Sequence, residues 1–212
     1  MARAISPKTL FEKKFDEFDF EGIWGDVFGK PEKGGVWIIY GAEKNGKTLF
    51  ALKLAEFLTK YENVWYISAE EGTGKEFQAN AQRAKIDPAS RKIKFSEYTE
   101  IEVVKERLSK RQAPKIVLFD NMTIYNDELK NGAFRRFTSE FPNTTMIFLA
   151  HEEKKEPYTA TAKLAKKLAK IYIRIEGLTA FVAGRCPGGI MAINEKTAML
   201  YHGSDIKNKI QK

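Results

Sequence analysis

The sequence has few of the residues that hold small secreted or zinc-dependent domains together. Its 212 residues include one cysteine, Cys186, and two histidines. A single cysteine cannot close an intramolecular disulfide, and this set is too small for the four side chains of a structural zinc site. Disulfide scaffolds and zinc modules are therefore excluded.

Long apolar runs are also missing. The mean hydropathy is −0.42, and charged side chains interrupt the sequence before any run reaches the ~18 apolar residues that a membrane span requires. Residues 1–14 contain no apolar segment of the kind that forms the core of a signal peptide. We therefore expect a soluble, cytoplasmic protein that has no membrane partner.

The charge balance is basic. Lysine and arginine number 36 against 28 aspartates and glutamates, which gives a formal net charge of +8. Such a surplus favours contact with polyanions such as nucleic acids. The basic residues are spread along the chain, and a basic globular enzyme with no nucleic-acid partner is equally compatible with this composition.

From residue 35 onward, short apolar runs alternate with amphipathic stretches. The apolar runs, typical of buried strands, cover residues 36–40, 64–68, 93–96, 116–120, 145–150 and 171–175. Helical patterns lie between them at residues 47–60, 75–85, 101–111, 128–141 and 161–170. The alternation predicts an α/β fold, with a mainly parallel central sheet and helices on both faces.

The two ends of the chain differ from this pattern. Residues 179–185, 189–194 and 198–201 are short strand-like runs separated by turn signals, and they predict an antiparallel extension at the C-terminal side of the sheet. Residues 1–34 form an aromatic-rich lead that we expect to pack on the core. We divide the chain into this lead, a core domain over residues 35–205, and a basic tail over residues 206–212.

Residues 41–48 match the pattern G-x-x-x-x-G-K-[ST] directly after a predicted buried strand and at the start of a predicted helix. Backbone N–H groups of such a loop surround an anion, Lys47 reaches the β- and γ-phosphates, and the Thr48 hydroxyl is a ligand of Mg²⁺. The alternative is a glycine turn with an incidental lysine. The predicted nucleotide-binding segment consists of Gly41, Ala42, Glu43, Lys44, Asn45, Gly46, Lys47, Thr48 and Leu49.

Three further polar side chains follow predicted strands. Asp120 ends an apolar run, and a carboxylate there is the second ligand that a Mg-nucleotide site needs, unless it only begins a turn. Glu70, next to Glu71, follows another strand and can orient or deprotonate an attacking water, unless the pair is a solvated acidic turn. His151 follows a third strand, where it can bond the γ-phosphate or lie idle at the surface.

Taken in order, these segments resemble the motifs of RecA-like P-loop ATPases, and most closely those of the RadA, DnaB and KaiC branch. Residues 41–48 are similar to Walker A, residues 68–70 to the family's S-x-E, residues 118–120 to Walker B, and residues 149–151 to its strand-end Gln or His. The resemblance implies an ATPase that uses ATP and Mg²⁺, with residues 35–205 as the RecA-like domain. It also implies that Glu70 activates water with Glu71 in reserve, that His151 senses the γ-phosphate, and that copies assemble into a ring or filament.

The C-terminal part resembles the family less closely. Residues 183–185 are similar to its K-x-R motif, whose basic residues reach the nucleotide of a neighbouring subunit. Arg185 matches the arginine and is the predicted catalytic residue that acts across subunits, although a strand-end surface arginine is an equal alternative. Ala183 stands where the lysine is expected, which puts activation between subunits in doubt.

The resemblance also implies that the loops after the strands ending at Asp120 and His151 face DNA. The second of these loops offers Lys154, Lys155 and the stacking side chain Tyr158 to single-stranded or double-stranded DNA. A helical stripe of lysines follows, and we interpret it as a solvated face. Lysines 163, 166, 167 and 170 make up this stripe.

Two functions remain open on the sequence. The first is an oligomeric, Mg-dependent ATPase that is coupled to DNA recombination, repair or replication. The second is a nucleotide-dependent switch that hydrolyses slowly or not at all and acts through a protein partner. Ala183 and the charged loop residues Glu43 and Lys44 favour the second.

Overall fold

The computed structural model describes residues 4–202, so the predicted tail at residues 206–212 lies outside the described part. The helices are α1 (Pro7–Phe11), α2 (Gly22–Phe28), α3 (Lys47–Leu58), α4 (Lys75–Arg83), α5 (Ile101–Leu108), α6 (Asn126–Leu129), α7 (Ala133–Glu140), α8 (Ala160–Leu168) and α9 (Glu195–His202). The strands are β1 (Gly35–Gly41), β2 (Val64–Ser68), β3 (Ile93–Ser96), β4 (Ile116–Asp120), β5 (Thr145–Glu153), β6 (Glu156–Pro157), β7 (Ile171–Glu176), β8 (Thr179–Gly184) and β9 (Gly189–Ala192).

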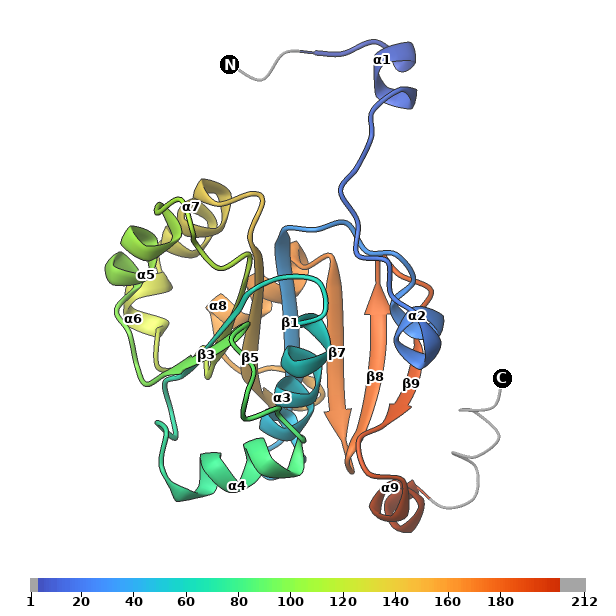
Figure 1. Ribbon diagram of the computed structural model, residues 1–212, viewed down its shortest axis with the longest axis vertical. Coiled ribbons are helices and arrows are strands. Elements are labelled where there is room, and N and C mark those ends of the chain that lie inside the picture. The colour runs from blue at the N-terminus through green and yellow to red at the C-terminus, as the bar shows by residue number, and fades with distance from the viewer. Residues whose placement is uncertain (1–3, 203–212) are drawn as a thin grey trace.

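One sheet runs through the molecule in the order β3-β2-β4-β5-β1-β7-β8-β9 (Figure 1). The six strands from β3 to β7 are parallel, while β8 and β9 add antiparallel strands at one side and β6 pairs with the end of β5. The predicted fold class is confirmed. All six carboxyl ends lie along one edge of the sheet, where ligands of such folds bind.

Helices cover both faces of the sheet because its central strands are apolar on both sides. In β1, Trp37 and Ile39 face the cluster that includes α3, whereas Ile38 and Tyr40 face the cluster on the other side. The second cluster contains side chains from α5, α6, α7 and α8. All of these β1 side chains are buried, as expected for strands that have helices on both sides.

Two predicted elements are wrong in detail. Residues 198–201 belong to a helix, α9, because the side chain of Asn194 accepts a hydrogen bond from Thr197 N and caps a helical turn. The single predicted helix at residues 128–141 is two helices, since Asn131 and Gly132 take left-handed φ values of 54° and 82° that end α6 before α7 begins. No helix within residues 4–202 is long and apolar enough to cross a membrane.

The aromatic lead has two parts. Residues 4–17 are exposed, and the part that carries α1 extends away from the body (Figure 1). From Phe18 onward the lead packs on α3: the Phe20 ring lies 4.9 Å from the ring of Phe57 and 5.2 Å from that of Tyr61. Phe18 and Phe28 are also buried, so this part of the lead adds a layer to the core.

Replacing Phe20 with alanine should destabilise the protein by about 3 kcal/mol, because it leaves a cavity between the lead and α3. Urea unfolding followed by circular dichroism measures the change. Phe15→Ala is the matched control, since Phe15 is 50% exposed and its removal should have a small effect. An equally small loss of stability in both variants would show that the lead is not part of the cooperative core.

Candidate functional site

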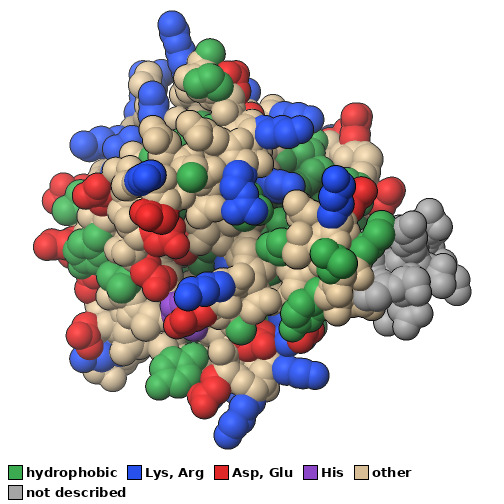
Figure 2. Space-filling model, turned by 90° about the horizontal axis from the view of Figure 1, so that it is seen from below, with side chains coloured by type: hydrophobic (Ala, Val, Ile, Leu, Met, Phe, Trp, Pro, Cys, Tyr) green, Lys and Arg blue, Asp and Glu red, His purple; other side chains and the backbone are tan. Residues whose placement is uncertain are grey.

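A cavity of about 500 Å³ lies at the carboxyl edge of the parallel strands. Its walls include the side chains predicted from the ends of three different strands and from the start of α3. Lys47, Thr48, Glu70, Asp120 and His151 all line it. The structure therefore brings these five together with Glu43, Lys44, Gly46 and Leu49 of the predicted nucleotide-binding segment. Acidic and basic side chains lie intermixed over this face (Figure 2).

The loop between β1 and α3 is shaped by its two glycines. A Cβ on Gly41 would meet the backbone oxygen of Ile175, and one on Gly46, whose φ is +94°, would meet the side chain of Leu178. The first turn of α3 has neither an acidic residue nor a side-chain cap. Its first N–H groups and the positive end of its dipole are therefore available to an anion.

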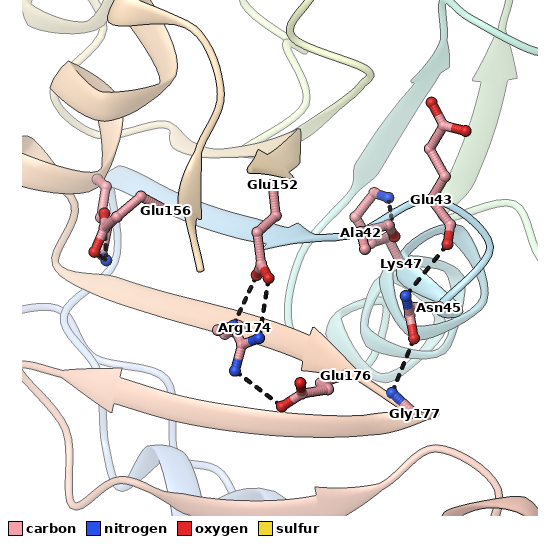
Figure 3. A network of polar contacts seen from close by, with 10 residues as sticks. Ala42, Glu43, Asn45, Lys47, Glu152, Glu156, Arg174, Glu176 and Gly177 are labelled. Carbon is pink, nitrogen blue, oxygen red and sulfur yellow. Dashed lines mark hydrogen bonds and ion pairs between the residues drawn. The ribbon is translucent and has the colours of Figure 1, made fainter. Parts of the chain in front are cut away.

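The loop is also fastened to the far side of the cavity. Asn45 donates from Nδ2 to the Glu43 carbonyl at 3.2 Å, and its Oδ1 accepts from Gly177 N at 3.0 Å (Figure 3). Gly177 lies in the turn between β7 and β8, and Arg174 near the end of β7 binds Glu152 through both arms of its guanidinium at 2.7 and 2.9 Å. This chain of bonds holds β5, β7 and the loop in one arrangement.

Lys47 is the buried cation of the cavity. Its Nζ donates to the carbonyl of Ala42 at 2.9 Å, within the loop itself (Figure 3). Burial lowers the pKa of this ammonium, and the nearby carboxylates of Asp120 and Glu70 oppose the shift. A buried positive charge interacts more strongly with phosphate oxygens than an exposed one.

Asp120 is the buried carboxylate that faces this cation. Burial raises its pKa to about 6, and the hydroxyls of Tyr66 and Thr48 oppose the rise. The bond from Tyr66 to Oδ2 is 2.6 Å long. A carboxylate and a hydroxyl side by side are hard oxygen ligands of the kind that Mg²⁺ prefers, so Asp120 and Thr48 fit the predicted metal site.

Glu70 is held at the mouth of the same cavity. Asn121 donates from Nδ2 to Glu70 Oε2 at 2.8 Å, and the Nε2 of His151 lies 3.4 Å from Glu70 Oε1. The Nδ1 of His151 is buried without a partner among the described residues. Glu71, by contrast, has a pKa raised chiefly by burial and then by the charge of Glu70. Of the two carboxylates, Glu70 is thus the one that neighbouring side chains hold in place.

Arg185 lies elsewhere. It follows β8, which runs antiparallel, and the last residue of that strand, Gly184, pairs with Ile171 at the beginning of β7. The Arg185 side chain is exposed at the edge opposite the cavity, and its backbone N–H bonds the carbonyl of Lys170 at 2.7 Å. Within one chain it cannot reach the loop, so its predicted role requires a second copy.

The three residues predicted to contact DNA lie together beyond the end of β5. Lys154 and Lys155 form the turn between β5 and β6 with φ values of 52° and 66°, and both are exposed. Tyr158 is 58% exposed. In the helical stripe of lysines, two side chains form salt bridges within the chain: Lys166 with Glu156, and Lys170 with Glu32.

Several site residues were not predicted from the sequence. Tyr66 and Asn121 hold the two carboxylates, and Asn80 and Arg83 of α4 complete the cavity wall. Tyr66 precedes Ser68 by two residues, which places it on the same face as Asp120 of the paired strand. The alternation of side chains between the two faces of β2 could be read from the sequence. No sequence pattern, by contrast, indicates that Asn80 and Arg83 of α4 reach the cavity.

The sequence matches no protein-family model and no curated protein. The structure is similar to a KaiC-like protein from Pyrococcus horikoshii, with a TM-score of 0.60, 14% identity, and coverage of 77% of this chain and 84% of that chain. It is also similar to the flagellar accessory protein FlaH from Methanocaldococcus jannaschii, with a TM-score of 0.60, 16% identity, and coverage of 84% and 95%. A third solved structure, an ATPase domain, gives a TM-score of 0.53 and 17% identity over 74% of this chain and 80% of that chain. The chain has the RecA-like P-loop fold that its motifs predicted.

Proposed function

We propose that this chain binds Mg-ATP at the loop between β1 and α3 and hydrolyses it. The observation that carries the proposal is the convergence of an uncapped helix start, Lys47 and a Thr48–Asp120 pair in one cavity. Backbone N–H groups and a buried cation bind phosphates. The similarity to a solved ATPase domain supports the same function.

The residues divide the work by position. Lys47 would leave the Ala42 carbonyl and bind the terminal phosphates, while Thr48 and Asp120 would hold the metal. Mg²⁺ bound there would neutralise phosphate charge. Glu70, fixed by Asn121, orients a water and accepts its proton, and His151 beside it bonds the γ-phosphate.

We further propose that copies of the chain assemble and that DNA is the partner. Arg185 is exposed at the edge opposite the cavity, where in a stack of copies it faces the nucleotide of the next one. The exposed turn at Lys154 and Lys155 and the ring of Tyr158 offer charge and stacking to a DNA strand. Recombination, repair or replication is the setting that fits such a partner.

The test is ATP hydrolysis by the purified protein with and without single-stranded DNA, at low and moderate salt, with Lys47→Ala as the inactive control. We expect DNA to increase turnover about tenfold or more at low salt, and the stimulation to fall as salt rises, because phosphate contacts release counterions. Lys154→Ala with Lys155→Ala should remove the stimulation without changing basal turnover.

ATP binding without stimulation by DNA would contradict the DNA motor and support the nucleotide switch. Ala183, in place of a second basic residue near Arg185, is the observation that favours this second function. Absence of ATP binding would overturn both functions.

A further inference from the structure

Tyr66 is a polar side chain in the middle of the core. It is the third residue of β2, it is 0% exposed, and its hydroxyl donates to Oδ2 of Asp120 at 2.6 Å. β2 and β4 are paired in parallel with Ser68 opposite Asp120. The hydroxyl therefore reaches the carboxylate from the neighbouring strand, on the side away from solvent.

The ring of Tyr66 is fixed by its neighbours. Phe77 of α4 lies 5.5 Å from it between ring centroids, Phe95 of β3 lies 6.1 Å from it, and these two rings are 5.4 Å apart. A ring packed between two others in a dense core stays close to one rotamer. The hydroxyl is therefore held against Asp120.

We propose that Tyr66 is a positioning residue for the metal ligand Asp120. Its hydroxyl fixes one carboxylate oxygen from behind, and the face of the carboxylate that lines the cavity stays directed at Thr48 and the metal. The inference rests on the proposed function, since it assumes that a Mg-nucleotide binds in the cavity. It goes beyond that function because neither the phosphate loop nor the strand-end carboxylates require a tyrosine on β2.

The physical reason is that a metal ligand must be oriented as well as present. Groups that hydrogen-bond a ligating carboxylate fix its orientation, and losing one such group weakens metal binding about 10-fold to 100-fold. Asp120 has few other ways to be held, since among the described side chains the one hydrogen bond that its carboxylate accepts comes from Tyr66. Thr48 is itself a ligand, which leaves Tyr66 as the support.

The test is the Mg²⁺ concentration needed for half-maximal binding of a fluorescent ATP analogue, compared between the wild type and Tyr66→Phe. The variant keeps the ring packing and removes only the hydroxyl. We expect the required Mg²⁺ concentration to rise about tenfold, from the loss of one support of the ligand. Nucleotide affinity at saturating Mg²⁺ and the unfolding midpoint should change little by comparison.

Tyr125→Phe is the matched control. Tyr125 is also 0% exposed, and its hydroxyl donates to the Thr99 carbonyl at 3.1 Å within the cluster on the other face of the sheet. It removes a buried tyrosine hydroxyl remote from the metal ligands, so it should leave the Mg²⁺ dependence unchanged. An equal shift in both variants, or no shift in Tyr66→Phe, would overturn the inference.

A double-mutant cycle identifies the route of the effect. In an Asp120→Asn background, Tyr66→Phe should cause no further change in the Mg²⁺ dependence, because the group that it positions is already gone. Additive changes would show that Tyr66 acts on the metal by another path and would overturn the inference. A wild type that binds no nucleotide at any Mg²⁺ concentration would instead contradict the proposed function itself.

Discussion

Glu70→Gln should lower the rate of ATP hydrolysis about a thousandfold, which is the contribution expected of a positioned general base. The amide keeps an oxygen for the bond from Asn121, so the side chain should stay in place. It can no longer take a proton from water. Steady-state phosphate release measures the loss, and binding of a fluorescent ATP analogue should remain within about threefold of the wild type, because Glu70 acts on the attacking water.

Glu71→Gln is the control for this prediction. Glu71 lies next to Glu70 and lines the same cavity, but among the described residues no hydrogen-bonding side chain orients it. Its replacement should leave most of the activity. The reverse result, with Glu71→Gln inactive and Glu70→Gln active, would exchange their roles. Unchanged hydrolysis in both variants would exclude a carboxylate base at this strand end.

Much of the parallel sheet was predictable because its strands are short, continuous apolar runs. The runs at residues 64–68 and 116–120 coincide with β2 and β4, since every residue of these strands is buried and no exposed position blurs their limits. The run at residues 93–96 coincides with the edge strand β3. The C-terminal part was harder. At residues 198–201, only Ala198 is buried, and a pattern that short cannot separate a strand from a helical turn.

The site was predictable where a motif fixes the backbone and unpredictable where contacts come from other elements. Residues 41–48 specify a turn before a helix, and parallel strands bring Glu70, Asp120 and His151 to the same edge. The hydrogen bond that Gly177 N donates to Asn45 Oδ1 joins residues that are 132 positions apart, so no local sequence pattern predicts it. The placement of Arg185 at the opposite edge follows only from the antiparallel direction of β8.

The stability of the protein should rise when Asp120 is replaced with asparagine, although the site loses its metal ligand. Burial raises the pKa of Asp120 from 3.8 to about 6, so at neutral pH the folded state holds a carboxylate whose charge it disfavours. A difference of ~2.2 pKa units, at 1.36 kcal/mol per unit, corresponds to about 3 kcal/mol. Asparagine retains an oxygen for the Tyr66 hydroxyl and removes the charge. The same substitution removes a charge that supports the buried Lys47 ammonium. We therefore expect Asp120→Asn to be more stable at pH 7.5 by less than this amount.

The pH dependence gives the sign of this effect. Because the folded pKa lies above the unfolded one, the folded state binds more protons between about pH 4 and pH 6, and wild-type stability falls as pH rises through that window. Urea unfolding should therefore show an advantage for Asp120→Asn that is larger at pH 7.5 than at pH 4.5. The exposed Asp127, whose pKa the Lys130 ammonium lowers, is the control, and Asp127→Asn should give no such gain.

Mg-ATP binding by Asp120→Asn should weaken about a hundredfold, from the loss of a metal ligand. A variant that is less stable than the wild type at pH 7.5 would show that Asp120 supports the fold; the expected gain would mean that the chain keeps a destabilising charge in its core for the sake of its ligand.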